Sequence, residues 1–134
     1  MSDDPTVSQT IIRVRFQETD QMGVVHHSNY AVWLEAARVE WMRGRGLSYR
    51  ELEDSGVSLA VSRLSVTYRR PARFDDLLSI ETRLDELRSR RCIFSYRVLI
   101  RDGPLLADAT TVHVPTDRSG RAVRLPQVWF DALR

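Results

Sequence analysis

Carboxylate and imidazole side chains lie close together in one polar stretch of the chain, residues 17–29. Asp20 stands in it, followed by Gly23 and by the adjacent pair His26 and His27. A carboxylate can act as a nucleophile or a general base, and Gly23 permits a close turn that brings Asp20 back toward later residues. The stretch therefore fits acyl transfer. Spacing alone leaves open that Asp20 only caps a turn and that both histidines lie on the surface.

A helix is predicted directly after this stretch, over residues 30–43, where neither Gly nor Pro occurs. Ser28 and Asn29 are both suitable N-caps, and Gly44 and Gly46 end the helix. The unpaired backbone N–H groups and the positive dipole end of such a helix can bind a developing oxyanion. The residues expected to form this backbone site and its pocket are Gly23, Val25, His26, Ser28, Asn29 and Tyr30.

The predicted helix is unusually apolar, and five strand-like segments surround it in the sequence. Its apolar residues at helical spacing are Tyr30, Trp33, Leu34, Ala37 and Trp41. The strand-like segments, most of them alternating apolar and polar residues, are 11–16, 64–68, 78–84, 92–100 and 105–114. This order predicts an α+β fold, in which a five-stranded antiparallel sheet wraps around one long central helix.

One domain accounts for most of the 134 residues. We expect a disordered N-terminal tail over residues 1–9 and a single domain over residues 10–134, closed by a short helix near Pro126. A five-stranded sheet leaves an edge exposed, so a homodimer or a dimer of dimers is expected. Neither a secretory signal nor an apolar run of about 20 residues is visible, which indicates a cytoplasmic protein without a membrane span.

Composition excludes several kinds of chemistry. All 20 basic residues are Arg, which rules out Schiff-base chemistry and a P-loop lysine. A formal net charge of +2, with aromatic residues on inward strand phases, disfavours nucleic-acid binding. The single cysteine, Cys92, lies on the apolar phase of its strand, so we expect a buried, unreactive thiol. Asp20, His26 and His27 have neither the spacing of a zinc helix motif nor a fourth ligand, so no metal site is predicted.

The sequence resembles a known family at residues 18–30, Glu-Thr-Asp-Gln-Met-Gly-Val-Val-His-His-Ser-Asn-Tyr, and at residues 35–38, Glu-Ala-Ala-Arg. Both are similar to the 4-hydroxybenzoyl-CoA thioesterase family of hotdog-fold enzymes, and most of all to the bacterial acyl-CoA thioesterases associated with the Tol-Pal system. Weaker likenesses lie at residues 68–72, 89–94 and 120–126, within a match that covers most of residues 11–128. The resemblance implies a hotdog fold.

The same resemblance implies hydrolysis of an acyl-CoA thioester with a small aromatic or short- to medium-chain acyl group. Asp20 matches the catalytic aspartate, which either attacks the carbonyl to form a mixed anhydride or acts as general base on water. His27 matches a histidine of the family motif, and a backbone N–H from His27 or a neighbour would polarise the carbonyl. His26 stands where members usually have Tyr or Phe, which bears on the shape of the acyl pocket. No metal or organic cofactor is implied, since coenzyme A is part of the substrate.

Arginines gather at one strand exit and at one hairpin, where guanidinium forks could hold the phosphates of coenzyme A. The candidates are Arg69, Arg70, Arg90 and Arg91. A cluster of charges on an exposed turn that only faces solvent is the alternative. An acyl carrier protein is an alternative carrier of the acyl group.

Two other functions fit the same scaffold. A hotdog hydratase or dehydratase of enoyl thioesters would use His27 as its base, but that class normally sets its Asp and His closer together than Asp20 and His27. A non-catalytic acyl-ligand-binding module would keep the fold without the reaction. The presence of Asp20 argues against this last interpretation.

Overall fold

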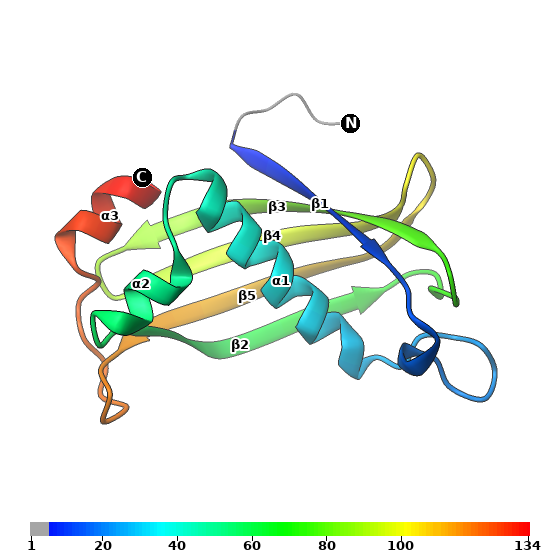
Figure 1. Cartoon of the computed structure of the whole chain (residues 1–134), viewed down its shortest axis with the longest axis horizontal. Helices are drawn as coiled ribbons and strands as arrows, with labels where there is room; N and C mark the ends of the chain where they lie inside the picture. The colour runs from blue at the N-terminus through cyan, green and yellow to red at the C-terminus, as the bar shows by residue number, and fades with distance from the viewer. Residues whose placement is uncertain (1–5) are drawn as a thin grey trace.

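The computed structural model describes residues 6–134 and contains a five-stranded antiparallel sheet with one long helix across its face (Figure 1). In chain order the elements are β1 Val7–Arg13, η1 Phe16–Glu18, α1 Ser28–Gly44, α2 Tyr49–Asp54, β2 Ser58–Tyr68, β3 Leu77–Arg88, β4 Arg91–Ile100, β5 Leu105–Thr116 and α3 Gln127–Leu133. The strands lie in the order β1-β3-β4-β5-β2, and every neighbouring pair is antiparallel. The predicted α+β architecture is confirmed.

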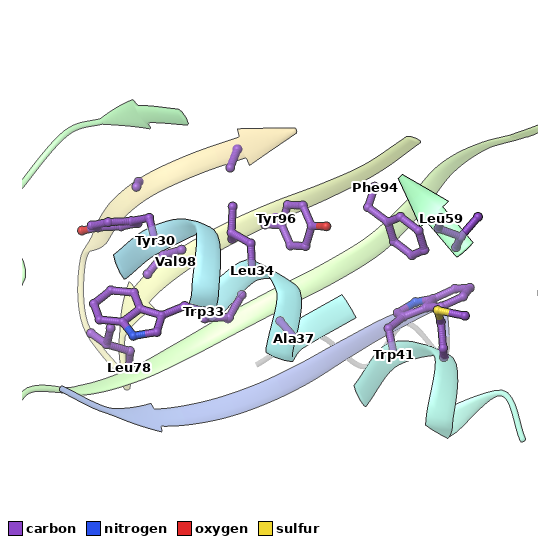
Figure 2. Packing of buried hydrophobic residues seen from close by; sticks show 14 of the residues in the cluster. Tyr30, Trp33, Leu34, Ala37, Trp41, Leu59, Leu78, Phe94, Tyr96 and Val98 are labelled. Atoms are coloured by element: carbon purple, nitrogen blue, oxygen red, sulfur yellow. The ribbon is translucent and has the colours of Figure 1, made fainter. Parts of the chain in front are cut away.

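The core lies between α1 and the sheet. Tyr30, Trp33, Leu34, Ala37 and Trp41, which the helical spacing places on one face, are all buried. Figure 2 shows them packed with side chains of the sheet, among them Phe94, Tyr96 and Val98. These three alternate with outward residues along β4, so they all point toward the helix. The other face of α1 is open in the single chain, where Val32 is 56% exposed.

The first strand begins earlier and ends earlier than its alternation predicts. Residues 7–9, expected in a disordered tail, pair with β3, because Val7 lies opposite Arg83 and the ladder continues to Arg13. Residues 1–5 of the expected tail lie outside the described residues. Phe16, expected on the inward phase, is 73% exposed in η1 and packs edge-on against Phe74 at 5.6 Å between ring centroids.

The start of α1 also differs from the prediction. The helix begins at Ser28 with His27 as its N-cap, one or two residues before the expected caps Ser28 and Asn29. The side chain of Asn29 instead donates to the backbone oxygens of Glu18 and His26, at 2.9 and 3.1 Å. The side chain of Asn29, a suitable N-cap, therefore anchors the preceding loop rather than the helix itself.

Candidate active site

A short hairpin joins η1 to α1 and carries the predicted catalytic residues. Thr19 pairs with Val25 in an isolated antiparallel bridge, and the amide of Asp20 donates to the carbonyl of Val24 at 2.8 Å. Gly23 closes the turn with a φ of 78°, a conformation that side-chain-bearing residues rarely adopt. Val25 is anchored in turn, since its amide donates to the carbonyl of Ala72 at 2.8 Å. The hairpin is thus held against the segment that follows β2.

The Asp20 carboxylate has one occupied oxygen and one open one. Its Oδ1 accepts the amides of Met22 at 2.8 Å and Val24 at 3.2 Å, which is the turn-capping role that spacing alone left open. Its Oδ2 accepts no bond from any residue within 6–134. The side chain is exposed. The two amides fix the orientation of the carboxylate, and Oδ2 remains available to a ligand.

The amide of His27 is also open, and its direction is set by the peptide that precedes it. The carbonyl of His26 accepts the backbone amide and the side-chain amide of Asn29, both at 3.1 Å, so this carbonyl points along α1. In a trans peptide the following N–H points the opposite way. The His27 N–H therefore points out of the helix start, where it has no acceptor among the described residues. An outward N–H at the positive end of a helix is a donor suited to an oxyanion.

The side chains of His26 and His27 lie against each other at the start of α1. Their rings stack with centroids 4.2 Å apart. The amide of Ser28 donates to Nδ1 of His26, and the hydroxyl of Ser28 lies 2.8 Å from the same nitrogen. Because Nδ1 accepts, the hydrogen of the neutral His26 ring is on Nε2. Within residues 6–134, no group of three or more His, Cys, Asp or Glu side chains is placed to hold a metal ion.

A cavity of about 330 Å³ opens beside the helix start. Its lining residues are Val24, Val25, His27, Tyr30, Tyr68, Arg69, Arg70, Pro71 and Ala72. Asp20 is bound to one of these lining residues, since the amide of Val24 donates to the Asp20 carboxylate. Of the predicted pocket residues, Val25, His27 and Tyr30 therefore share this cavity, while Gly23, His26, Ser28 and Asn29 shape the loop around it.

Two tyrosines form the apolar wall of this cavity. Tyr30 is buried and meets Tyr68 edge-on, with ring centroids 5.0 Å apart. Burial, with a smaller contribution from Tyr68, raises the pKa of Tyr30 to about 12, so its hydroxyl stays neutral at physiological pH. Sequence reasoning missed Tyr68 as a site residue. The signal was present, since Tyr68 shares the inward phase of β2 with Val66 and immediately precedes Arg69.

The structure separates the two arginine groups that were predicted to bind coenzyme A. Arg69 and Arg70 line the cavity at the end of β2. Arg90 and Arg91 lie at the turn between β3 and β4, at the opposite end of the sheet (Figure 1). A strand of this length spans about 40 Å, so the second group cannot reach the cavity of its own chain. The guanidinium of Arg69 is held by Asp108, with Nε 2.6 Å from its carboxylate, whereas Arg70 makes no ion pair among the described residues.

Comparison with known proteins assigns this fold to a class. The description of the matching family model is Thioesterase-like superfamily, over residues 14–133. The acyl-CoA thioester hydrolase YbgC of Escherichia coli is 34% identical over 106 residues, which is 79% of either chain. The crystal structure of a hypothetical protein from Thermus thermophilus is 50% identical, with a TM-score of 0.89 over 95% of each chain. A DHNA-CoA thioesterase from Staphylococcus aureus is 28% identical, with a TM-score of 0.90 over 94% of this chain and 87% of its own.

The antiparallel sheet around one long helix is the fold of the hotdog thioester hydrolases. The chain belongs to the thioesterase-like superfamily, within its 4-hydroxybenzoyl-CoA thioesterase-like part. No helix in the described part of the chain is long and apolar enough to cross a bilayer.

Proposed function

We propose that this protein hydrolyses acyl-CoA thioesters at the cavity beside the start of α1. In this mechanism the thioester carbonyl lies between the His27 amide and the Oδ2 atom of Asp20. The amide would stabilise the oxyanion that forms on the carbonyl oxygen. The observation that carries the proposal is a cavity lined by His27, whose helix-start amide is open, and by Val24, whose amide binds the Asp20 carboxylate.

Asp20 can serve this reaction by two routes. As a general base it would take a proton from water while the water oxygen adds to the carbonyl carbon, and collapse of the tetrahedral intermediate would release the thiolate. As a nucleophile its Oδ2 would add to the carbonyl carbon and expel the thiolate by breaking the C–S bond, and water would then hydrolyse the resulting mixed anhydride to the free acid and the Asp20 carboxylate. Both routes need an ionised carboxylate with a free oxygen. The residues named above supply every group that either route requires, so we propose that no metal or organic cofactor takes part, and activity should survive dialysis against a chelator.

The cavity suits a small acyl group. Its volume of about 330 Å³ is at the lower end of the range of ligand pockets, which favours a small aromatic or short- to medium-chain acyl group. The wall formed by Tyr30 and Tyr68 is apolar and fits such a group. Arg70, which has no carboxylate partner, would meet the phosphates of coenzyme A at the cavity mouth, whereas Arg69 is held by Asp108.

We propose that the functional unit is a homodimer joined along β2. This strand is a sheet edge, so one side of its backbone lacks a partner strand. Its inward phase also carries Val61, Leu64 and Tyr68, each about half exposed, which α1 does not cover. Pairing with a second copy would satisfy the edge and cover these side chains. Sedimentation equilibrium would test this, and a monomer at micromolar concentration would contradict it.

The proposed reaction is tested by Asp20→Asn. Asn keeps an oxygen for the amides of Met22 and Val24, so the turn should persist, but it can neither take a proton nor attack. We expect free-thiol release from acyl-CoA to fall by about 10³-fold with the fold unchanged by circular dichroism. A variant that keeps near wild-type turnover would refute the assigned role. The acyl-CoA panel should span aromatic and aliphatic chains.

The same panel separates the two other functions. Loss of enoyl absorbance from crotonyl-CoA without thiol release would indicate a hydratase. Saturable acyl-CoA binding without any hydrolysis would indicate a binding module. Assignment to the branch of thioesterases associated with the Tol-Pal system stays a prediction that rests on the likeness of residues 18–30 and 35–38. A cytoplasmic location also stays a prediction.

A further inference from the structure

Glu18 is a buried carboxylate that the proposed reaction does not use. Its exposed fraction is 3%, although it ends the short helix η1, whose first residue Phe16 is 73% exposed. Its Oε1 accepts the backbone amide of Arg15 at 2.7 Å, and its Oε2 accepts the indole N–H of Trp33 at 2.8 Å. The guanidinium of Arg15 adds a longer contact to Oε2 at 3.3 Å. Three donors from two elements therefore converge on one buried carboxylate.

These contacts keep Glu18 ionised. Burial alone would raise the pKa of its carboxyl, but the bonds from the Arg15 amide, the Trp33 indole and the Arg15 side chain outweigh burial and lower that pKa. A carboxylate that is held in this way has little freedom to rotate. Its charge is matched by hydrogen bonds in a protein interior, where such bonds are stronger than in water.

The backbone of Glu18 holds the catalytic peptide at the same time. Its carbonyl accepts the amide of His26 and the side-chain amide of Asn29, both at 2.9 Å. The peptide between His26 and His27 carries the proposed oxyanion donor, and its carbonyl is held by the same Asn29. Asp20 is two residues from Glu18 along the chain. Glu18 thus connects α1, through Trp33, with both halves of the proposed catalytic pair.

We propose that Glu18 is a positioning residue for thioester hydrolysis, which fixes the His27 amide relative to Asp20 by tying the loop to Trp33 of α1. This inference rests on the proposed function. It assigns Glu18 no contact with the substrate, because its carboxylate is buried and occupied on both oxygens. A displacement of about 1 Å in such a constellation can lower a rate by about 100-fold, so the effect belongs in kcat.

Glu18→Gln tests this with little change of shape. A carboxamide has one oxygen, so its NH₂ group must face either the Arg15 amide or the Trp33 indole, and both are donors. We expect kcat to fall by about 100-fold with KM changed less than threefold. An unchanged kcat, or a rise in KM alone, would overturn the inference.

A second substitution should partly reverse the first. In Glu18→Gln with Trp33→Phe the indole donor is gone, so the carboxamide can turn its oxygen to the Arg15 amide and its NH₂ away. We expect the double variant to be faster than Glu18→Gln alone, a result that a general loss of folding would not produce. The matched control is Glu81→Gln, which removes a carboxylate paired with Arg97 on the sheet at 3.1 Å and should leave kcat and KM unchanged.

A measurement without substrate separates this inference from the proposed function. The backbone amide resonances of His26 and His27 should shift or broaden in Glu18→Gln, while those of β5 stay in place. If those resonances do not move, the inference is wrong even where thioesters are hydrolysed. If the His26 and His27 resonances move but Asp20→Asn keeps full turnover, the proposed function is wrong. The link that Glu18 makes between the loop and Trp33 would still be correct.

Discussion

Two buried side chains of opposite charge, Glu18 and Arg38, lie at α1, and they differ in how many hydrogen bonds they make. Glu18 accepts three hydrogen bonds on its carboxylate. Arg38, farther along the helix, is 6% exposed and forms no ion pair with any described residue. Its one hydrogen bond goes to the hydroxyl of Tyr96 at 3.4 Å, and its Nε has no partner. One buried charge is thus fully matched and the other is not.

A chain of polar groups continues from Arg38 through the core. The Tyr96 hydroxyl lies 2.6 Å from the hydroxyl of Thr111, which lies 2.7 Å from Nε2 of His113. His113 is completely buried, and its Nδ1 has no hydrogen-bond partner within residues 6–134. A partly satisfied buried network is destabilising, whereas a fully satisfied one fixes geometry. We infer from this difference that the contacts of Glu18 fix the geometry of the loop before α1. The network from Arg38 to His113, in contrast, lowers the stability of the fold.

The largest effect that we predict from this comparison is a loss of folding stability in acid, caused by His113. Burial, with the nearby charge of Arg38, lowers the pKa of His113 to about 4. The unfolded chain binds this proton below about pH 6.5. Between pH 6.5 and 4 the unfolded state therefore binds more protons, so stability falls as the pH falls, by about 3 kcal/mol over the window.

Urea unfolding at a series of pH values measures this loss. His113→Gln removes the titrating group and should flatten the stability curve between pH 6.5 and 4. Glu18 acts in a different window, because its lowered pKa gives a contribution that is lost only as the pH falls below about 4.5. If the free energy of unfolding fell equally steeply with pH in wild type and His113→Gln above pH 4.5, the prediction would be wrong. The loss of stability in acid would then come from another group.

Much of the fold was readable from the sequence, because alternation and helical spacing depend on neighbouring residues. The apolar face of α1 and the inward phase of β4 were both predicted correctly, and Cys92 is buried as expected, with its pKa raised to about 12 by burial. The ends of elements were less readable. β1 ends before Phe16 because the amide of Arg15 binds Glu18, a side chain beyond the strand.

The site was predictable only as far as it is local. Asp20, Gly23 and His27 lie within eight residues, and the hairpin between them follows from turn chemistry. Glu18 escaped notice because its partner Trp33 is 15 residues away, and no pattern in the sequence marks an indole that points at a carboxylate. The distance of Arg90 and Arg91 from the cavity of their own chain was hidden for a similar reason, since only the direction of the strands places them at the far end of the sheet.

A middle-sized effect is expected at Arg38. Arg38→Met keeps an unbranched side chain of similar length and removes a buried charge that has no carboxylate partner, while Tyr96 keeps Thr111 as its own partner. We expect stability at pH 7 to rise by about 1 kcal/mol. Loss of the Arg38 charge should also raise the pKa of His113 and shorten the acid-sensitive window. Thermal unfolding at pH 7 and pH 5 measures the gain in stability and the smaller loss in acid. A clear loss of stability at pH 7 would contradict the prediction and would indicate that Arg38 has a partner in the assembled protein.

The smallest effect is expected at Arg15, on the Glu18 side. Its guanidinium is 59% exposed and contacts Glu18 at 3.3 Å, whereas its backbone amide makes the shorter bond. Arg15→Gln keeps that backbone amide, so Glu18 retains its two strongest donors. An exposed partner of this kind contributes about 0.5 kcal/mol. Urea unfolding should show a loss of stability of that order, and kcat should change less than twofold. A fall in kcat as large as that of Glu18→Gln would contradict this. It would mean that the charge of Arg15, rather than the bonds from the Arg15 backbone amide and Trp33, holds the loop.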